Sequence, residues 1–171
     1  MTLTATFSLS ASGVLTKDDT VSVVSDPVSS GSNSFPDLTI DLTDGTGALQ
    51  ANNWARKYFT LAATTMTSYD LVGTDVDPFG AANNLTRVVA IVAAVVDPDG
   101  VKALRIGPQA QATPFSGPFN ATTSYVTFGY WQAFFAPTTA GWVAAGGSTD
   151  KLYVYNPGAA SVDFVLWVLG S

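Results

Sequence analysis

Short runs in which polar and apolar residues alternate recur along this chain, separated by glycine, proline, asparagine and aspartate. The alternation is strict from Thr2 to Ala11, where every even position is threonine or serine and every odd position is apolar. A period of two puts neighbouring side chains on opposite faces and is typical of a half-buried β-strand. About ten such runs at close intervals, without a convincing amphipathic helix, predict an all-β, antiparallel β-sandwich of jelly-roll-like type.

The acidic residues favour the same fold class and narrow the chemistry. All thirteen are aspartates, and glutamate, histidine and cysteine are absent. Aspartate is common in turns and caps and poor in helix interiors. Without cysteine and histidine the chain lacks the usual zinc ligands, thiol nucleophiles and general bases near neutral pH.

A loop rich in serine, proline and glycine, Ser25–Pro36, marks the expected domain boundary. Residues 1–36 are expected to form a short N-terminal β arm or extra strands, which include the runs Thr2–Ala11 and Thr20–Val24. Residues 37–171 are expected to form the sandwich domain. Its strands are predicted at 38–42, 56–62, 66–72, 85–96, 101–106, 124–128, 130–136, 151–155 and 162–169.

The run Leu85–Val96 is the strongest core candidate, because it is rich in valine and isoleucine and contains neither glycine nor proline. Its alanines leave a buried helix open as an alternative to a strand. The following Asp97-Pro98-Asp99-Gly100 suits a β-turn, so we expect a hairpin with Val101–Ile106.

The aspartates suggest two chemistries, and a plainer interpretation accounts for both. The segment Asp75–Gly80 begins like a calcium-binding loop but lacks the later acidic ligands, which favours an ordinary turn. A pair of aspartates would serve a glycoside hydrolase, yet several of them lie in turn sequences such as Asp44-Gly45. A serine nucleophile would need an activating base, and without histidine only a lysine is available. We therefore expect no enzyme, no cofactor and no bound metal.

The charge balance argues against nucleic acid and membrane partners. The net charge is −6, and the seven basic residues are scattered. The first twelve residues lack the basic and apolar regions of a signal peptide, and the apolar run Val88–Val96 is about half the length of a membrane-spanning helix.

A segment of 44 residues, Ile106–Thr149, carries no charge and is rich in aromatic residues. Solubility usually requires interspersed charge, so part of this segment is expected to be covered by another subunit, although one sandwich burying it all is the alternative. In the adjacent pair Phe134 and Phe135, one side chain should enter the core and the other face a neighbour. The candidate subunit or capsid contacts are Leu3, Phe7, Leu9, Phe115, Phe119, Trp131, Phe134, Phe135 and Trp142.

Aromatic residues also raise the possibility of a glycan platform, since aromatic faces stack on sugar rings, whereas the plainer interpretation is that most belong to the core. The residues concerned are Trp54, Trp131, Trp142, Trp167, Tyr125, Tyr130, Tyr153 and Tyr155.

Several turn motifs resemble those of β-sandwich proteins of tailed-phage virions. They are DLTDGTGALQANNW at 41–54, DPFG at 77–80 with LTRVVAI at 85–91, and GGSTDKL at 146–152 with NPG at 156–158. The resemblance covers residues 38–171 and implies a jelly-roll capsid decoration or cement protein that binds the major capsid protein at the head exterior, commonly as a homotrimer. It implies a location on the virion after assembly in the host cytoplasm. The alternative is a tail-fibre or spike module that recognises surface glycan.

Overall fold

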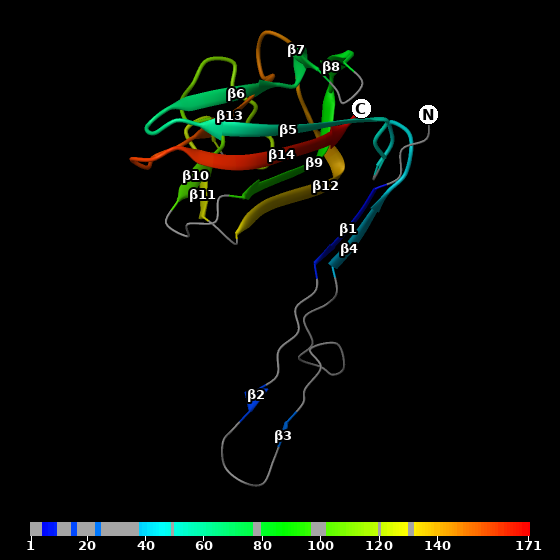
Figure 1. Cartoon of the computed structure of the whole chain (residues 1–171). Helices are drawn as coiled ribbons and strands as arrows, with labels where there is room; N and C mark the ends of the chain where they lie inside the picture. The colour runs from blue at the N-terminus through cyan, green and yellow to red at the C-terminus, as the bar shows by residue number, and fades with distance from the viewer. Residues whose placement is uncertain are drawn as a thin grey trace. The chain divides into compact units, whose positions relative to one another are not determined.

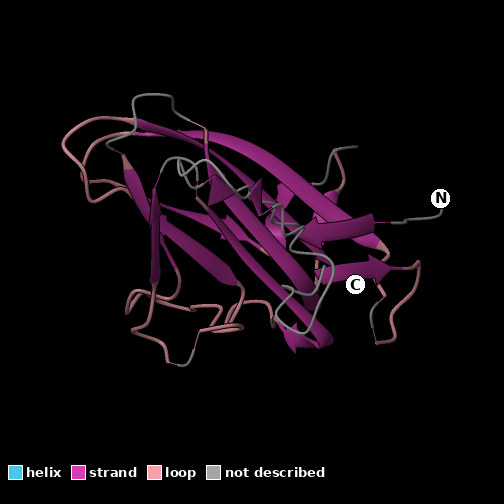
Figure 2. Ribbon diagram, turned by 90° about the horizontal axis from the view of Figure 1, so that it is seen from below, coloured by secondary structure: helices cyan, strands magenta, loops and turns pink. Residues whose placement is uncertain are grey.

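The protein is all-β in a computed structural model that describes residues 5–9, 15–16, 23–24, 38–48, 50–76, 80–96, 102–119, 121–129 and 132–171. For residues up to 42, and for 133, 135, 137 and 139, it describes the backbone alone. The described part consists of strands and loops, with no helix (Figure 2). No helix in this part is long and apolar enough to cross a membrane.

The contact pattern separates residues 4–42 from a second unit that contains residues 43–171. In the N-terminal unit β1 (Ala5–Leu9) pairs antiparallel with β4 (Leu38–Leu42), and β2 (Leu15–Thr16) pairs with β3 (Val23–Val24) (Figure 1). The run 38–42, expected to open the sandwich, therefore pairs within the N-terminal unit. The division into domains 1–36 and 37–171 stays a prediction.

The second unit is a sandwich of two four-stranded antiparallel sheets. One sheet has the order β12-β9-β14-β5, formed by Ala133–Val143, Arg87–Val95, Val162–Gly170 and Asn53–Leu61. The other has the order β11-β10-β13-β6, formed by Val126–Gly129, Ala103–Ile106, Lys151–Tyr155 and Met66–Asp70. A small ribbon of β7 (Val72–Val76) and β8 (Ala82–Asn84) follows β6.

In each sheet of the sandwich, strands from early in the chain lie beside strands from late in the chain. Numbered from β5 onward without the β7–β8 ribbon, they lie in the orders first-eighth-third-sixth and second-seventh-fourth-fifth. Strands distant in sequence are therefore neighbours, as the pairing of β5 with β14 along Asn53–Leu61 and Val162–Gly170 illustrates (Figure 1).

Alternate residues of both sheets fill one core between them. The cluster takes Ile91, Phe164 and Leu166 from one sheet and Leu104 and Leu152 from the other, all essentially buried. The period of two in the sequence is thus the alternation between core and outer face.

One expectation for this part of the chain is confirmed and another is wrong. The run Leu85–Val96 contains the strand β9, as predicted, and not the alternative helix. The expected hairpin with β10 is wrong, because β9 pairs with β12 and β14 whereas β10 pairs with β11 and β13 in the opposite sheet. The physical reason is that β9 is apolar at nearly every position, so it needs a neighbour on each side and cover on each face.

Candidate interaction surfaces

Across β9, β14 and β5, the outer face of the β12-β9-β14-β5 sheet is mainly apolar. Since Phe164 and Leu166 enter the core, the intervening Val165 and Trp167 lie on the outer face. Directly across from them, Tyr58 pairs with Val165, and Val92 pairs with Trp167. The side chain of Tyr58 is 59% exposed and that of Trp167 is 37% exposed.

Arg56 and Asp163 add charge to this face. Arg56 pairs in register with Trp167, and its guanidinium lies 5.7 Å from the centre of the indole ring. Asp163 pairs with Thr60, whose hydroxyl donates a hydrogen bond of 2.6 Å to the carboxylate. The two charges lie on opposite sides of the row formed by Tyr58 and Val165. Charges placed in this way fix the orientation of a partner that packs on the apolar row.

The outer face of the other sheet is more polar. Arg105 on β10 lies 4.7 Å from the ring of Tyr125 and 5.9 Å from that of Tyr155, so its charge is held over two aromatic rings. Lys151 pairs in register with Asp70 on β6. The two sheets thus present chemically different outer faces.

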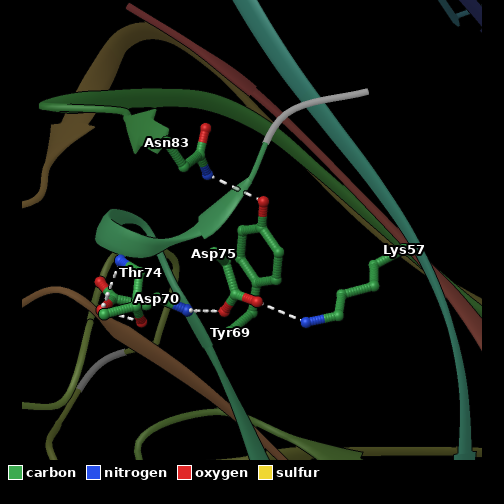
Figure 3. A network of polar contacts seen from close by, with 6 residues as sticks. All are labelled: Lys57, Tyr69, Asp70, Thr74, Asp75 and Asn83. Atoms are coloured by element: carbon green, nitrogen blue, oxygen red, sulfur yellow. Dashed lines mark hydrogen bonds and ion pairs between the residues drawn. The ribbon is translucent and has the colours of Figure 1, made fainter. Parts of the chain in front are cut away.

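A polar network joins β5, β6 and the β7–β8 ribbon (Figure 3). The Asp75 carboxylate accepts hydrogen bonds from Lys57 and from the backbone N–H of Asp70, the latter at 2.7 Å. Tyr69 accepts a bond of 2.8 Å from the amide of Asn83. These contacts fix the start of the segment that resembled a calcium loop, since both oxygens of Asp75 already have partners.

Asp70 is the most constrained carboxylate in this network. It accepts hydrogen bonds from Val72 N–H and from both the N–H and the hydroxyl of Thr74. Burial raises the pKa of Asp70, but these hydrogen bonds, with the positive charge of Lys151, together hold that pKa below its ordinary value of 3.8. Its role is to close the turn after β6, because all three donors lie within four residues of it.

No group of three or more metal-ligating side chains of the histidine, cysteine and acidic types occurs among the described residues. Asp77, the second aspartate of the calcium-like segment, lies outside them. One serine and lysine do have the spacing of a Ser-x-x-Lys pair, Ser148 and Lys151, but the Ser148 hydroxyl donates to the carbonyl of Ala145 at 3.1 Å and so belongs to the turn before β13.

Four of the predicted contact residues lie in or against the core of the sandwich. Phe115 is fully buried and Phe119 is 7% exposed, so both lie in the core of one chain. Phe134 stacks on Phe119 at 5.6 Å, and Trp142 also packs against the core while remaining partly exposed. The side chains of Leu3, Phe7, Leu9, Trp131 and Phe135 lie outside the described residues.

Sequence analysis did not select Tyr58, Arg56 or Val165 for this surface. The available signal was the run Val162–Leu169, which is apolar at both odd and even positions apart from Asp163. A strand with that pattern is covered on both faces. Only the pairing register then shows that Tyr58 and Arg56 extend the same outer face onto β5.

No family model and no curated protein matches the sequence, whereas several solved chains are similar in structure. One of these chains belongs to the Cyanophage Pam1 capsid asymmetric unit. It is 14% identical, the match covers 75% of this chain and 89% of that chain, and the TM-score is 0.31. A TM-score this low assigns neither a shared fold nor a shared function.

Proposed function

We propose that this chain is a bacteriophage virion structural protein that decorates the head. It binds the major capsid protein from the outside, as a homotrimer, and stabilises the shell by packing and strand pairing without catalysis. Many identical copies multiply a modest free energy per site, so no single contact has to be strong.

The observation that carries this proposal is the β1–β4 ribbon. Its register pairs Phe7 with Ile40 and Ser8 with Thr39, so the apolar positions of the two strands share one face and the polar positions share the other. A two-stranded ribbon is marginally stable alone in water. A unit of this kind gains stability by laying its apolar face, or an open strand edge, on a partner protein.

The nested strand order supports the same proposal. Pairing of the first strand with the eighth, the second with the seventh and the third with the sixth is the order that arises when a long antiparallel ribbon wraps into two Greek keys. This order supports a jelly-roll type for the sandwich, an architecture that viral capsid proteins use.

The proposal is tested by sedimentation of the purified protein with capsids that lack it. Wild-type protein should co-sediment and raise the temperature at which the capsids open. An Ile40→Asp variant should lose at least about tenfold in capsid affinity, because it places a charge on the apolar face of the ribbon.

The matched control is Thr39→Asp, which adds the same charge at the neighbouring position on the polar face. It should bind capsids nearly as well as wild type. Equal binding by both variants would overturn the ribbon as the capsid contact. A wild-type protein that ignores capsids and binds host cells instead would overturn the decoration function.

A further inference from the structure

Over β5, β14 and β9, the outer face of the β12-β9-β14-β5 sheet lacks the polar pattern of a solvated antiparallel sheet. Such a sheet normally packs one face on the core and exposes polar residues on the other. Here three rows cross the strands β5, β14 and β9, and each contains an exposed or half-exposed apolar side chain. In order along the strands the rows are Thr60–Asp163–Val96, Tyr58–Val165–Ala94 and Arg56–Trp167–Val92.

Three exposed large apolar side chains of the described residues lie on this face. They are Tyr58, Trp167 and Val96. Val96 is 42% exposed, and its N–H donates to the carbonyl of Asp163. A contiguous apolar surface rimmed by charge is the ordinary mark of a protein contact.

We propose that a second copy of this chain covers this face, related to the first by a two-fold axis through the Tyr58–Val165 row. The argument is charge complementarity. The middle row is apolar, the row on one side contains Asp163, and the row on the other side contains Arg56. A two-fold rotation about an axis along the middle row exchanges the two outer rows. Arg56 of each copy then faces Asp163 of the other copy, so the isologous contact contains two equivalent ion pairs.

The two charges do not satisfy each other within one chain. Asp163 lies opposite Thr60 in the β5–β14 register. Thr60 is four residues from Arg56 along β5, a distance of about 13 Å. Arg56 lies instead against Trp167, where a neighbouring carboxylate would add to the existing cation–π contact, and Asp163 accepts one hydrogen bond from Thr60. The apolar middle row excludes water between the two new ion pairs and so strengthens them.

An isologous contact joins copies in pairs, so the assembly contains an even number of chains. It is a dimer if this contact acts alone and a hexamer if trimers are paired through it. The number of chains therefore tests the inference separately from capsid binding, because it is measured without any capsid present.

The experiment is analytical ultracentrifugation of wild type and charge variants over a range of protein concentrations. Wild type should form a dimer or a hexamer. Arg56→Asp and Asp163→Arg should each weaken that pairing by about tenfold or more, since like charges then face each other, and the double variant with both changes should restore it.

The matched control is Val76→Lys, which places a charge on an exposed apolar residue of β7, outside this face, and should leave pairing unchanged. Circular dichroism and thermal unfolding verify that each variant is folded. If a charge variant does not fold, Tyr58→Lys provides a second test, because it places a charge in the apolar middle row and should also weaken pairing. A monomer or a trimer in the wild type, or even-numbered assembly that both single variants retain, overturns the inference.

Discussion

Asp70 closes the turn between β6 and β7, and its charge makes that turn sensitive to acid. Asp70→Asn should destabilise the fold at pH 7 by about 1–3 kcal/mol, because the amide group cannot accept all the hydrogen bonds that Val72 and Thr74 donate to the carboxylate. The free energy of unfolding, measured by urea titration, compares the two proteins.

The pH dependence follows from the lowered pKa of Asp70. A carboxyl group whose folded-state pKa lies below its unfolded value stabilises the fold fully above the ordinary value of 3.8, and that contribution is lost as the pH falls through the lowered folded-state value. The difference between wild type and Asp70→Asn should therefore narrow below about pH 4. A difference that stays constant from pH 7 to pH 3 would assign the effect of the substitution to packing instead of charge.

Close approach of β14 to β9 depends on one glycine at the end of β14. A Cβ on Gly170 would lie 2.1 Å from the carbonyl oxygen of Arg87, at the place where the β14–β9 register shifts. Gly170→Ala should therefore lower the free energy of unfolding by about 1–3 kcal/mol, because the backbone at this position cannot move aside without breaking the ladder. Denaturant titration provides the measurement.

Gly146→Ala is the comparison for that substitution. A Cβ there would meet the Val72 side chain at 3.3 Å, and this methyl group can shift. Its effect should stay within about 0.5 kcal/mol, as for other surface changes. Similar losses from both alanine variants would show that the close approach of the new Cβ to the Arg87 carbonyl does not set the cost.

Individual strands were predictable from the sequence, whereas their neighbours were not. The period of two places β13 at Lys151–Tyr155 to the residue, because turn residues bound it on both sides. The β9–β10 hairpin was wrong because a turn sequence indicates only that the chain reverses, not which sheet the next strand joins. The ribbon of β7 and β8 was missed, since its sequence is rich in glycine and polar residues and its pairing depends on the Asp75 and Asn83 contacts.

The exposed residues of the candidate surface were also not predictable from the sequence. Burial of Phe115 follows from local hydrophobicity, which made it indistinguishable from a contact residue. Exposure of Tyr58 and Trp167 follows from the register of β5 with β14, strands that are more than ninety residues apart in the chain. A property set by long-range pairing cannot be read from either strand alone.

The whole chain combines a ribbon of two strands with a sandwich of two four-stranded sheets, and these should differ in local stability. Amides of β9 and β14 have strand neighbours on both sides and belong to a large core, so they should exchange hydrogen only on global unfolding. Amides of β1 and β4 should exchange at least about tenfold faster, because a two-stranded ribbon opens without unfolding the sandwich.

Binding to capsids should reduce this difference in hydrogen-exchange rate between the ribbon and the sandwich. If the ribbon is the capsid contact, hydrogen exchange in β1 and β4 should slow on binding while exchange in β9 and β14 stays the same. Hydrogen exchange with mass spectrometry, with and without capsids, measures both sets of amides in one experiment. Slower exchange in β6, β10, β11 and β13 with no change in β1 and β4 would move the capsid contact to the more polar sheet, whose Arg105 and Lys151 would then be the residues to change next.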